Sequence, residues 1–503
     1  MAVFDDDVSR ILLVDLKPYD VNSAAVTTLR VASTEYATEP SDTPSSALYF
    51  GVVQDDIYTD RAMFTGDNVG GLSLPDFGAL TVINPKQPDI GAEFDDWLDP
   101  AQYTWQGREI DIYVLQEGAA YSTRTKVFSG VIKELQYEEN TIRVTYRSKA
   151  YLLDDPIQAN RYAGSGGDEG GADLEGKPKP LCFGRVSNIQ PIFVDTSTLR
   201  YQYHDGEVQS NDEARDRGSP LVITTDYTDD LTDGFIDLVA EADGTITQDV
   251  KGSTLGGTYS AQPADIMEYM VETLRGLSDI DTASISAVNA ARGYEVGYYT
   301  GSDNPNYNQA LTDIAKNFNG YFGFNRAGEF DIGIFDAPSG SADIELDEQD
   351  IEIDSLKRDP LGDIVYKVTV NARPSVEVQN TDSFAGGVDE DKKALYSKEY
   401  QLSVVATDAS VLTKYPEAKE LVIDTTIYSE TDAQDLADAL LAYWKEPRSK
   451  FRLTTNLRPL SVSINDVVKI THSRYNLSAG KNFNVIRFKE FYLKNRVELT
   501  VAG

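Results

Sequence analysis

The sequence predicts a mainly β protein with an α+β insert, in which two β-barrel-like domains enclose a smaller α+β domain. Three observations predict this class. The 503 residues are enough for about three or four domains at roughly 150 residues each. Short segments that alternate between apolar and polar residues fill both ends of the chain, and apolar residues at helical spacing occur mainly between them.

Residues 1–160 are expected to form an N-terminal β-barrel or sandwich domain. In TIRVTYR, Ile142, Val144 and Tyr146 share one face, which is typical of a half-buried antiparallel strand. Glu138-Glu139-Asn140 joins it to the strand before. The other strands predicted here are ILLVDL, AVTTLRV, ALYFGVV, ALTVI, EIDIYVL and VFSGVIKELQY.

Residues 161–257 are expected to form a loop rich in glycine and acid, followed by a β insert. The stretch AGSGGDEGGADLEG, residues 163–176, has no apolar periodicity and the glycine content of a tether, so we expect a domain boundary or a long mobile loop there. Between Leu181 and Val194, two strand-like runs surround a candidate turn at Ser187-Asn188.

Residues 258–345 are expected to form the α+β domain. In PADIMEYMVETLRGL, Pro263 suits a first helical turn and Gly276 ends the helix. A second helix precedes a hairpin in which GYFGF and EFDIGIF flank the turn 325–328. The apolar stripes of the two helices are Ile266, Met267, Met270, Val271 and Leu274, and Leu311, Ile314, Ala315 and Phe318.

Residues 346–503 are expected to form a C-terminal β-barrel domain with one helix, TDAQDLADALLAYWKEP. Thr431 and Gln434 are candidates for a capping box, and Pro447 closes the helix. Its apolar stripe is Leu436, Ala437, Leu440, Leu441 and Trp444. The strands include IVYKVTVNA, KEYQLSVVA, DVVKITHSR, NFNVIRFKEFYL and RVELTV, the last after a turn at Lys494-Asn495.

The excess of acidic residues limits the kinds of partner that the protein can bind. The 82 acidic residues outnumber the 45 basic ones and give a net charge of −37, which argues against a nucleic-acid-binding surface, because such surfaces need clustered lysine and arginine. The first residues, MAVFDDDVSR, are acidic where a signal peptide is basic, and no run of about 18 apolar residues occurs. We therefore expect a soluble chain that is not exported by a standard signal and has no membrane segment.

Cys182 is the only cysteine, so the chain has no internal disulfide. As a nucleophile it would need a histidine base, and only His204 and His472 exist. Lys177, Lys179 and Arg185 are candidates to stabilise its thiolate, but Cys182 lies between Leu181 and Phe183 in a strand-like run, where cysteine behaves as a small hydrophobe. We expect Cys182 to be buried and no catalytic residue to be present.

No metal or cofactor site is predicted. Acidic clusters precede Gly234 and Gly244 and occupy residues 389–391, but none has the ligand spacing of a calcium loop, and surface charge is the favoured interpretation. HExxH, Walker A and GxSxG motifs are absent, and 82 acids single out no glycosidase pair. The 29 tyrosines are compatible with an interface or with ordinary β structure.

Three stretches carry motifs that are specific in combination. KPKPLCFGRVSNIQPIFVD, residues 177–195, is followed by YQYHDGEV and RDRG. QPADIMEYMVETL leads through AARGYEVGYY to NGYFGFNRAGEFDIGIF, and DVVKITHSRYNLSAGKNFNVIRF lies near the end. From about residue 125 onward, the chain resembles the baseplate hub, or tail-tip, proteins of long-tailed bacteriophages and gene transfer agents.

The resemblance implies a multidomain fold like that of a phage tail hub and a structural role in the virion, at the tail tip or baseplate, after synthesis in the cytoplasm of the bacterial host. It implies a homotrimer whose two barrel-like domains per chain form a pseudo-sixfold ring below the tail tube. Genomic DNA would pass through the lumen without specific binding, repelled by acidic residues. The implied partners are the distal tail protein, the tape measure protein and tail fibre or tip proteins.

Two other functions stay open on the residues alone. A tail-associated hydrolase of cell wall or glycan would require a concave site with two close carboxylates. A β-rich adhesin that binds glycan or calcium would require an exposed aromatic or acidic site.

Overall fold

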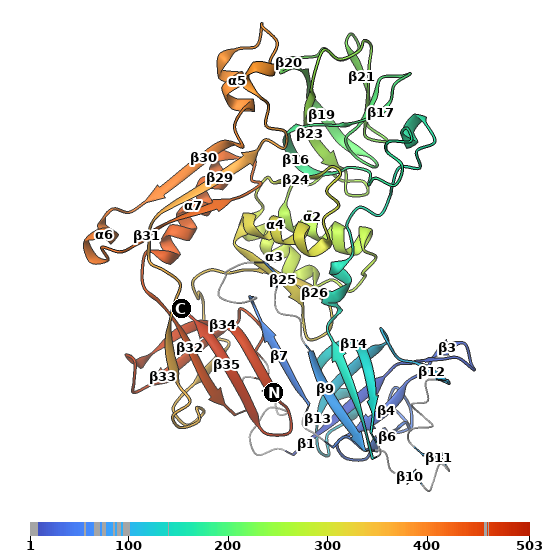
Figure 1. Ribbon diagram of the computed structural model, residues 1–503. Helices are drawn as coiled ribbons and strands as arrows, with labels where there is room; N and C mark the ends of the chain where they lie inside the picture. The colour runs from blue at the N-terminus through green and yellow to red at the C-terminus, as the bar shows by residue number, and fades with distance from the viewer. Residues whose placement is uncertain are drawn as a thin grey trace.

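The computed structural model describes residues 9–54, 57–64, 71–72, 77–83, 86–87, 92–93, 101–138, 140–456, 460 and 462–503. The acidic N-terminal residues 1–8 and Glu139 of the predicted turn lie outside the described residues. Strands dominate both ends of the chain and helices concentrate between them, so the mainly β prediction with an α+β insert is confirmed. Figure 1 shows two sheets side by side at one end of the molecule, helices in the middle and a β insert at the other end.

The N-terminal region builds an eight-stranded sheet with the order β5-β6-β4-β1-β13-β14-β15-β9. Ile142, Val144 and Tyr146 are buried as expected, because they face the core on alternate positions of β15. The strands are β1 (Arg10–Leu16), β4 (Leu29–Ala32), β5 (Tyr36–Ala37), β6 (Leu48–Gly51), β9 (Phe77–Ile83), β13 (Glu109–Gln116), β14 (Thr125–Tyr137) and β15 (Thr141–Arg147). Shorter strands are β2 (Tyr19–Asp20), β3 (Ala25–Val26), β10 (Lys86–Gln87), β11 (Ala92–Glu93) and β12 (Tyr103–Thr104).

Residues 163–176 form a loop whose backbone groups bond to one another, and the domain boundary or mobile loop expected there stays a prediction. Backbone hydrogen bonds join Gly164 N–H to the Glu169 carbonyl and Gly166 N–H to the Gly170 carbonyl. These glycines adopt positive φ, which lets the chain turn tightly enough to make these bonds. Leu174 anchors the loop in a small buried cluster with Tyr162, Val194 and Phe235.

The predicted turn at Ser187-Asn188 is wrong, because strand β16 (Leu181–Ile189) runs through it. Asn188 does have a positive φ of 51°, but it sits where the pairing with β23 shifts register, so the polar pair marks a β-bulge. The insert has a core of its own. Its other strands are β17 (Ile192–Asp195), β18 (Arg200–Gln202), β19 (Val208–Asp216), β20 (Ser219–Pro220), β21 (Tyr227–Asp230), β22 (Phe235–Leu238) and β23 (Ile246–Ser253).

The α+β region contains one helix more than the sequence predicts. The first expected helix is α2 (Pro263–Tyr269), which continues as the π-helical turn η5 (Met270–Leu274), and the second is α4 (Tyr307–Ala315). The additional helix α3 (Thr282–Arg292) is capped by the Asp281 carboxylate, but its small residues leave only a weak apolar stripe. The region also holds β24 (Gly297–Thr300), η6 (Lys316–Phe318), β25 (Gly320–Phe324) and β26 (Phe330–Ile334).

A three-stranded sheet in the order β30-β29-β31 carries helix α7 (Glu430–Trp444) on one face. The capping box at Thr431 is wrong: the N-cap is Ser429, two residues earlier, and its side chain accepts a hydrogen bond from the N–H of Asp432. The strands are β29 (Val365–Pro374), β30 (Tyr400–Thr407) and β31 (Lys419–Asp424). Two short helices that the sequence did not predict, α5 (Glu390–Tyr396) and α6 (Ser410–Lys414), lie in the connections.

The C-terminal sheet joins the two ends of the chain. Its order is β27-β33-β34-β35-β32-β28, and β7 (Tyr58–Ala62) from the N-terminal region pairs antiparallel with β34. β8 (Gly71–Leu72) likewise pairs with β25. The remaining strands are β27 (Ile344–Leu346), β28 (Lys357–Leu361), β32 (Arg448–Thr455), β33 (Val467–His472), β34 (Leu477–Phe491) and β35 (Arg496–Ala502). One large apolar core runs from β1 to β35.

Candidate functional site

Cys182 lies on β16 in the core of the insert and is inaccessible to solvent, as the sequence predicts. The fold brings His204 next to it, but the contact is a hydrogen bond of 2.9 Å from the Cys182 backbone N–H to Nδ1 of His204. Burial raises the pKa of the Cys182 thiol and lowers the pKa of His204 to about 4. A neutral thiol beside a neutral imidazole has no thiolate to use as a nucleophile.

Two of the three cations near Cys182 in sequence contact other partners, and none of the three contacts the thiol in any interaction that the structure shows. Lys179 Nζ lies 2.8 Å from Glu169, and Lys177 is exposed. The Arg185 guanidinium lies 4.0 Å from the centre of the Tyr428 ring and 3.4 Å from the Glu295 carboxylate. Their role is therefore structural.

The acidic clusters also have structural partners. Asp389 caps helix α5 by accepting a hydrogen bond from the N–H of Asp391. Asp230 pairs with Arg200 at 2.6 Å, and Asp229 accepts a hydrogen bond from Asn211. Within the described part of the chain, no group of three or more His, Cys, Asp or Glu side chains is arranged to hold a metal ion. No described helix is long and apolar enough to cross a membrane.

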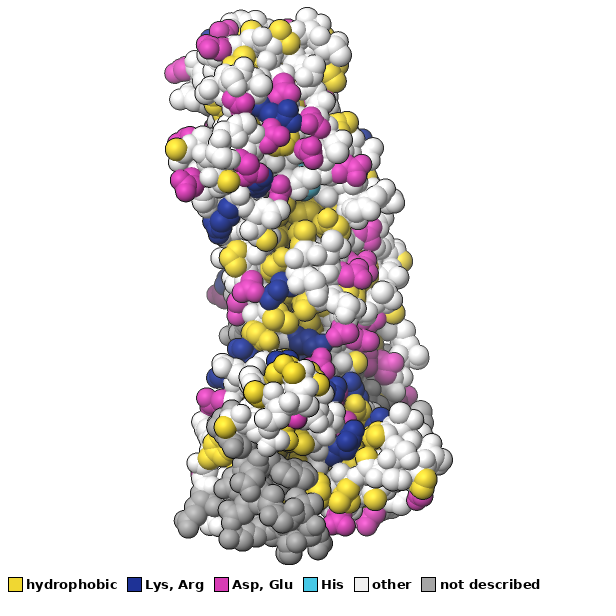
Figure 2. All heavy atoms as spheres, turned by 90° about the vertical axis from the view of Figure 1, so that its right-hand side faces the viewer, with side chains coloured by type: hydrophobic (Ala, Val, Ile, Leu, Met, Phe, Trp, Pro, Cys, Tyr) yellow, Lys and Arg dark blue, Asp and Glu magenta, His cyan; other side chains and the backbone are white. Residues whose placement is uncertain are grey.

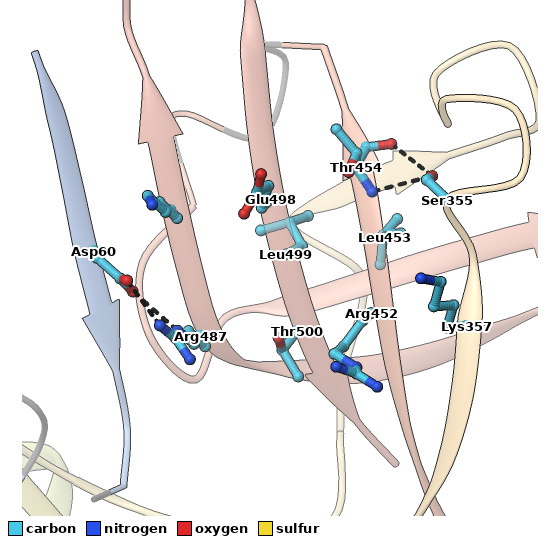
Figure 3. Close-up of a pocket in the computed structure, with 11 residues that line it drawn as sticks. Asp60, Ser355, Lys357, Arg452, Leu453, Thr454, Arg487, Glu498, Leu499 and Thr500 are labelled. Carbon is cyan, nitrogen blue, oxygen red and sulfur yellow. Dashed lines mark hydrogen bonds and ion pairs between the residues drawn. The ribbon is translucent and has the colours of Figure 1, made fainter.

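A basic groove of about 380 Å³ lies on the polar face of the C-terminal sheet (Figure 3). The pairing register places Arg487, Thr500, Arg452 and Lys357 in one row across β34, β35, β32 and β28. Lys489 and Glu498 stand opposite each other in the next row. Side chains on this face alternate with core residues, so the sheet holds the charges at fixed spacing.

Two arginines of the groove are held by acids at its margins. Arg487 makes two hydrogen bonds to the Asp60 carboxylate on β7, at 2.9 and 2.7 Å, which raise the pKa of Arg487 (Figure 3). Arg452 lies 2.8 Å from Asp359 and keeps 57% of its side chain exposed. Lys489 lies 4.5 Å from the Tyr58 ring.

The groove has no activated nucleophile. The Ser355 hydroxyl accepts a hydrogen bond from the Thr454 N–H at 3.2 Å, and its own hydrogen has the carbonyls of Glu352 at 2.7 Å and Thr454 at 3.3 Å as acceptors, so backbone groups occupy it (Figure 3). Among the residues that the structure describes, no imidazole lines the groove. Fixed guanidinium and ammonium groups suit the binding of carboxylate or phosphate surfaces.

A second basic groove, of about 460 Å³, lies over β14 and β15 of the N-terminal sheet. Its cations are Lys133, Arg143 and Arg147, which outnumber the two acids of the lining, Glu134 and Asp154. Tyr58 of β7 lines this groove and also contacts Lys489 of the first groove, so the two adjoin at β7. Together they form the two-sheet basic face, with the cations Lys133, Arg143, Arg147, Lys357, Arg452, Arg487 and Lys489.

This face stands out in an acidic protein. Figure 2 shows acidic side chains spread over the upper part of one side of the molecule, with lysine and arginine more frequent near the sheets below. The face was not predicted, although the sequence carries a signal for it: residues 445–503 hold 12 lysines and arginines against four acids, in a chain whose net charge is −37. Counting charge by region would have located the C-terminal half of the face.

Comparison with known proteins finds solved structures that align with the chain but no sequence family. No family model and no curated protein matches the chain. A 43 kDa tail protein of prophage MuSo2 from Shewanella oneidensis is 10% identical, aligns over 98% of both chains and has a TM-score of 0.41. The prophage tail protein gp18 from Listeria monocytogenes is 10% identical over 98% of this chain and 94% of that chain, with a TM-score of 0.42. A virion protein of a native gene transfer agent particle is 11% identical over 65% of this chain and 84% of that chain, with a TM-score of 0.44.

Proposed function

We propose that the chain is a structural protein of the tail tip of a long-tailed phage or gene transfer agent, where it forms a hub ring below the tail tube. One observation carries the proposal: the two ends of the chain build two β regions that lie side by side and are joined by the pairing of β7 with β34 (Figure 1). Three copies of such a chain would present six β regions around an axis, as the motif resemblance implies.

The two β regions also share a surface property. Each carries a basic groove on the polar face of its sheet, and the grooves adjoin at β7. This likeness supports equivalent roles for the two regions in one ring. A basic face in the channel would bind the phosphates of a passing genome. We therefore assign the two-sheet basic face to contacts with neighbouring protein chains, and we assign acidic side chains to the wall of the channel.

The proposed role requires no catalysis. Cys182 and His204 are buried and neutral, and the groove in Figure 3 lacks an activated nucleophile. The proposed partners are a second and a third copy of the chain, the distal tail protein, the tape measure protein and the fibre or tip proteins.

The mass of the assembly that the purified protein forms in solution tests the proposal. We expect about three chains per particle by analytical ultracentrifugation, and a gold label on the protein at the tail tip in electron micrographs of assembled particles. A Lys357→Glu/Lys489→Glu variant is expected to lower the trimer fraction, because it reverses charge on the two-sheet basic face.

The matched control is Lys398→Glu/Lys414→Glu, which makes the same charge change at exposed positions outside that face. Equal trimer fractions for the two variants would contradict the assignment of the face to protein contacts. A monomer that releases sugar or peptide from cell envelopes would overturn the proposed function and favour the hydrolase.

A further inference from the structure

Strand β31 is an open edge of the β30-β29-β31 sheet. Among the described residues it pairs only with β29, in parallel register. An open edge presents unpaired backbone N–H and C=O groups, and these are the groups that bind another strand. Such edges are often covered in the folded protein, whereas a groove adjoins this one.

The unpaired backbone groups of β31 belong to its even-numbered residues. The N–H of Lys419 donates to the carbonyl of Ile364, at the start of β29. Because successive residues of a strand direct their N–H to opposite sides, Glu420, Val422 and Asp424 direct theirs to the open side. Val422 is also 58% exposed, which is high for a valine in a sheet.

A groove of about 610 Å³ runs beside this edge. Leu421 and Ile423 of β31 contribute apolar side chains, as do Leu440 and Trp444 of α7. The start of β25 completes the lining with Asn319 and Gly320. A strand added to β31 would turn every second side chain towards this apolar lining.

The two ends of the edge differ in charge. At the start of the strand, Lys419 is neutralised by Asp363 at 2.7 Å. At its end, burial and the carboxylates of Asp424 and Glu399 raise the pKa of Tyr400 to about 12. The end of β31 at Asp424 is therefore acidic, and it suits a basic residue of a binding partner.

We propose that this groove receives an extended segment of a partner polypeptide, which adds to β31 as a further strand. The segment carries apolar side chains at alternate positions, facing the groove, and a basic residue beside Asp424. A second copy of the chain is a poorer occupant through its open edge β30, because the inward residues Val404 and Ala406 of that strand are already buried in its own core. The inference does not depend on the tail function, so the two can fail separately.

The test uses the purified chain and a short synthetic peptide in which valine alternates with threonine and one end carries lysine. Trp444 lines the groove, so we expect a saturable change in tryptophan emission. Hydrogen exchange should slow at the amides of Glu420, Val422 and Asp424. Both changes are expected to disappear when lysine is replaced by glutamate in the peptide, since that end of the edge is acidic.

Two N-methylated versions of the peptide separate strand addition from simple apolar binding. A strand pairs through only one of its two edges. One of the two peptides, methylated at the odd or at the even positions, should therefore bind at least about tenfold more weakly, and the other should bind as the unmodified peptide does. Equal binding of both versions would overturn the proposal.

A protein variant makes the same distinction. Val422→Pro removes an N–H that faces the open side and leaves the ladder to β29 in place, so peptide binding should be lost while the melting temperature stays near that of the parent chain. Val422→Thr keeps the N–H and is the matched control. Unchanged peptide affinity in folded Val422→Pro would contradict strand addition, and if that variant does not fold, the N-methylated peptides decide.

Discussion

At the scale of single residues, burial decides what Cys182 and His204 can do. Their residue types would suit a nucleophile and its base, yet both are buried and they meet through the Cys182 backbone N–H rather than its thiol. Burial disfavours the charged form of each group, so the thiol stays protonated and the imidazole stays neutral. The hydrogen bond to Nδ1 makes His204 an acceptor for the backbone of β16, which is a structural role.

The pKa of His204 predicts a pH dependence of stability. Because burial lowers it from 6.5 to about 4, the unfolded chain binds a proton that the folded chain does not bind between these pH values. Folding stability should therefore fall as the pH falls from 6.5 to 4, by about 3 kcal/mol over the whole window. The measurement is urea unfolding at pH 7, 5.5 and 4.5.

His204→Asn should remove this contribution, because asparagine can accept the same backbone hydrogen bond without titrating in this range. His472→Asn is the control, since His472 is the other histidine and lies on the C-terminal sheet. If the free energy of unfolding depends on pH in the same way for the parent chain and for His204→Asn, the prediction is wrong.

At the scale of elements, backbone hydrogen bonds decide where helices and strands begin and end. Ser429 caps α7 although Thr431 and Gln434 have the spacing of a capping box. The Asp432 carboxylate also accepts a hydrogen bond from the Glu295 N–H, which ties the start of α7 to the chain before β24. The position of this helix start is therefore set by a contact distant in sequence.

The two candidate caps can be distinguished by substitution. Ser429→Ala should destabilise the protein by about 1 kcal/mol, because the N–H of Asp432 loses its acceptor. Thr431→Ala should change stability by less than about 0.5 kcal/mol, since Thr431 is exposed within the first turn. Thermal unfolding of both variants is the measurement. A larger loss of stability for Thr431→Ala than for Ser429→Ala would indicate that Thr431 is the N-cap, as the sequence predicts.

At the scale of the whole molecule, a buried ion pair joins three distant segments. Glu490 of β34 is inaccessible to solvent, and its carboxylate lies 2.6 Å from Arg326 in the β25–β26 turn. Thr59 of β7 and Tyr492 are hydrogen-bonded to each other at 2.5 Å, and the hydroxyl that does not donate in that pair donates to the same carboxylate. Burial raises the pKa of Glu490, and the nearby arginine opposes that rise. The contact holds the N-terminal, α+β and C-terminal regions together.

Breaking this pair should be costly. Arg326→Met removes the cation that hydrogen-bonds to the buried carboxylate and leaves only the attraction of Arg61, so we expect a loss of about 3–5 kcal/mol at neutral pH. Arg487→Met is the control: its pair with Asp60 lies on the same sheet, but half of the Arg487 side chain is exposed, and the expected loss is about 0–1 kcal/mol. The measurement is the free energy of urea unfolding, and similar losses for the two variants would contradict a buried role for Glu490. Adding Glu490→Gln to Arg326→Met should recover part of the loss.

The sequence by itself determined the mainly β class, the helices α2, α4 and α7, and the burial of Cys182, because each depends on a local pattern of apolar residues. It did not determine α3, whose small residues give a weak stripe, or the bulge at Asn188, whose turn-like polar pair lies inside a strand. Only the tertiary structure decided that β7 joins β34, that the two basic grooves adjoin there and that β31 keeps an open edge. These features depend on which strands become neighbours. The spacing of apolar residues in the sequence specifies which face of a strand is buried, but it does not specify the strand with which it pairs.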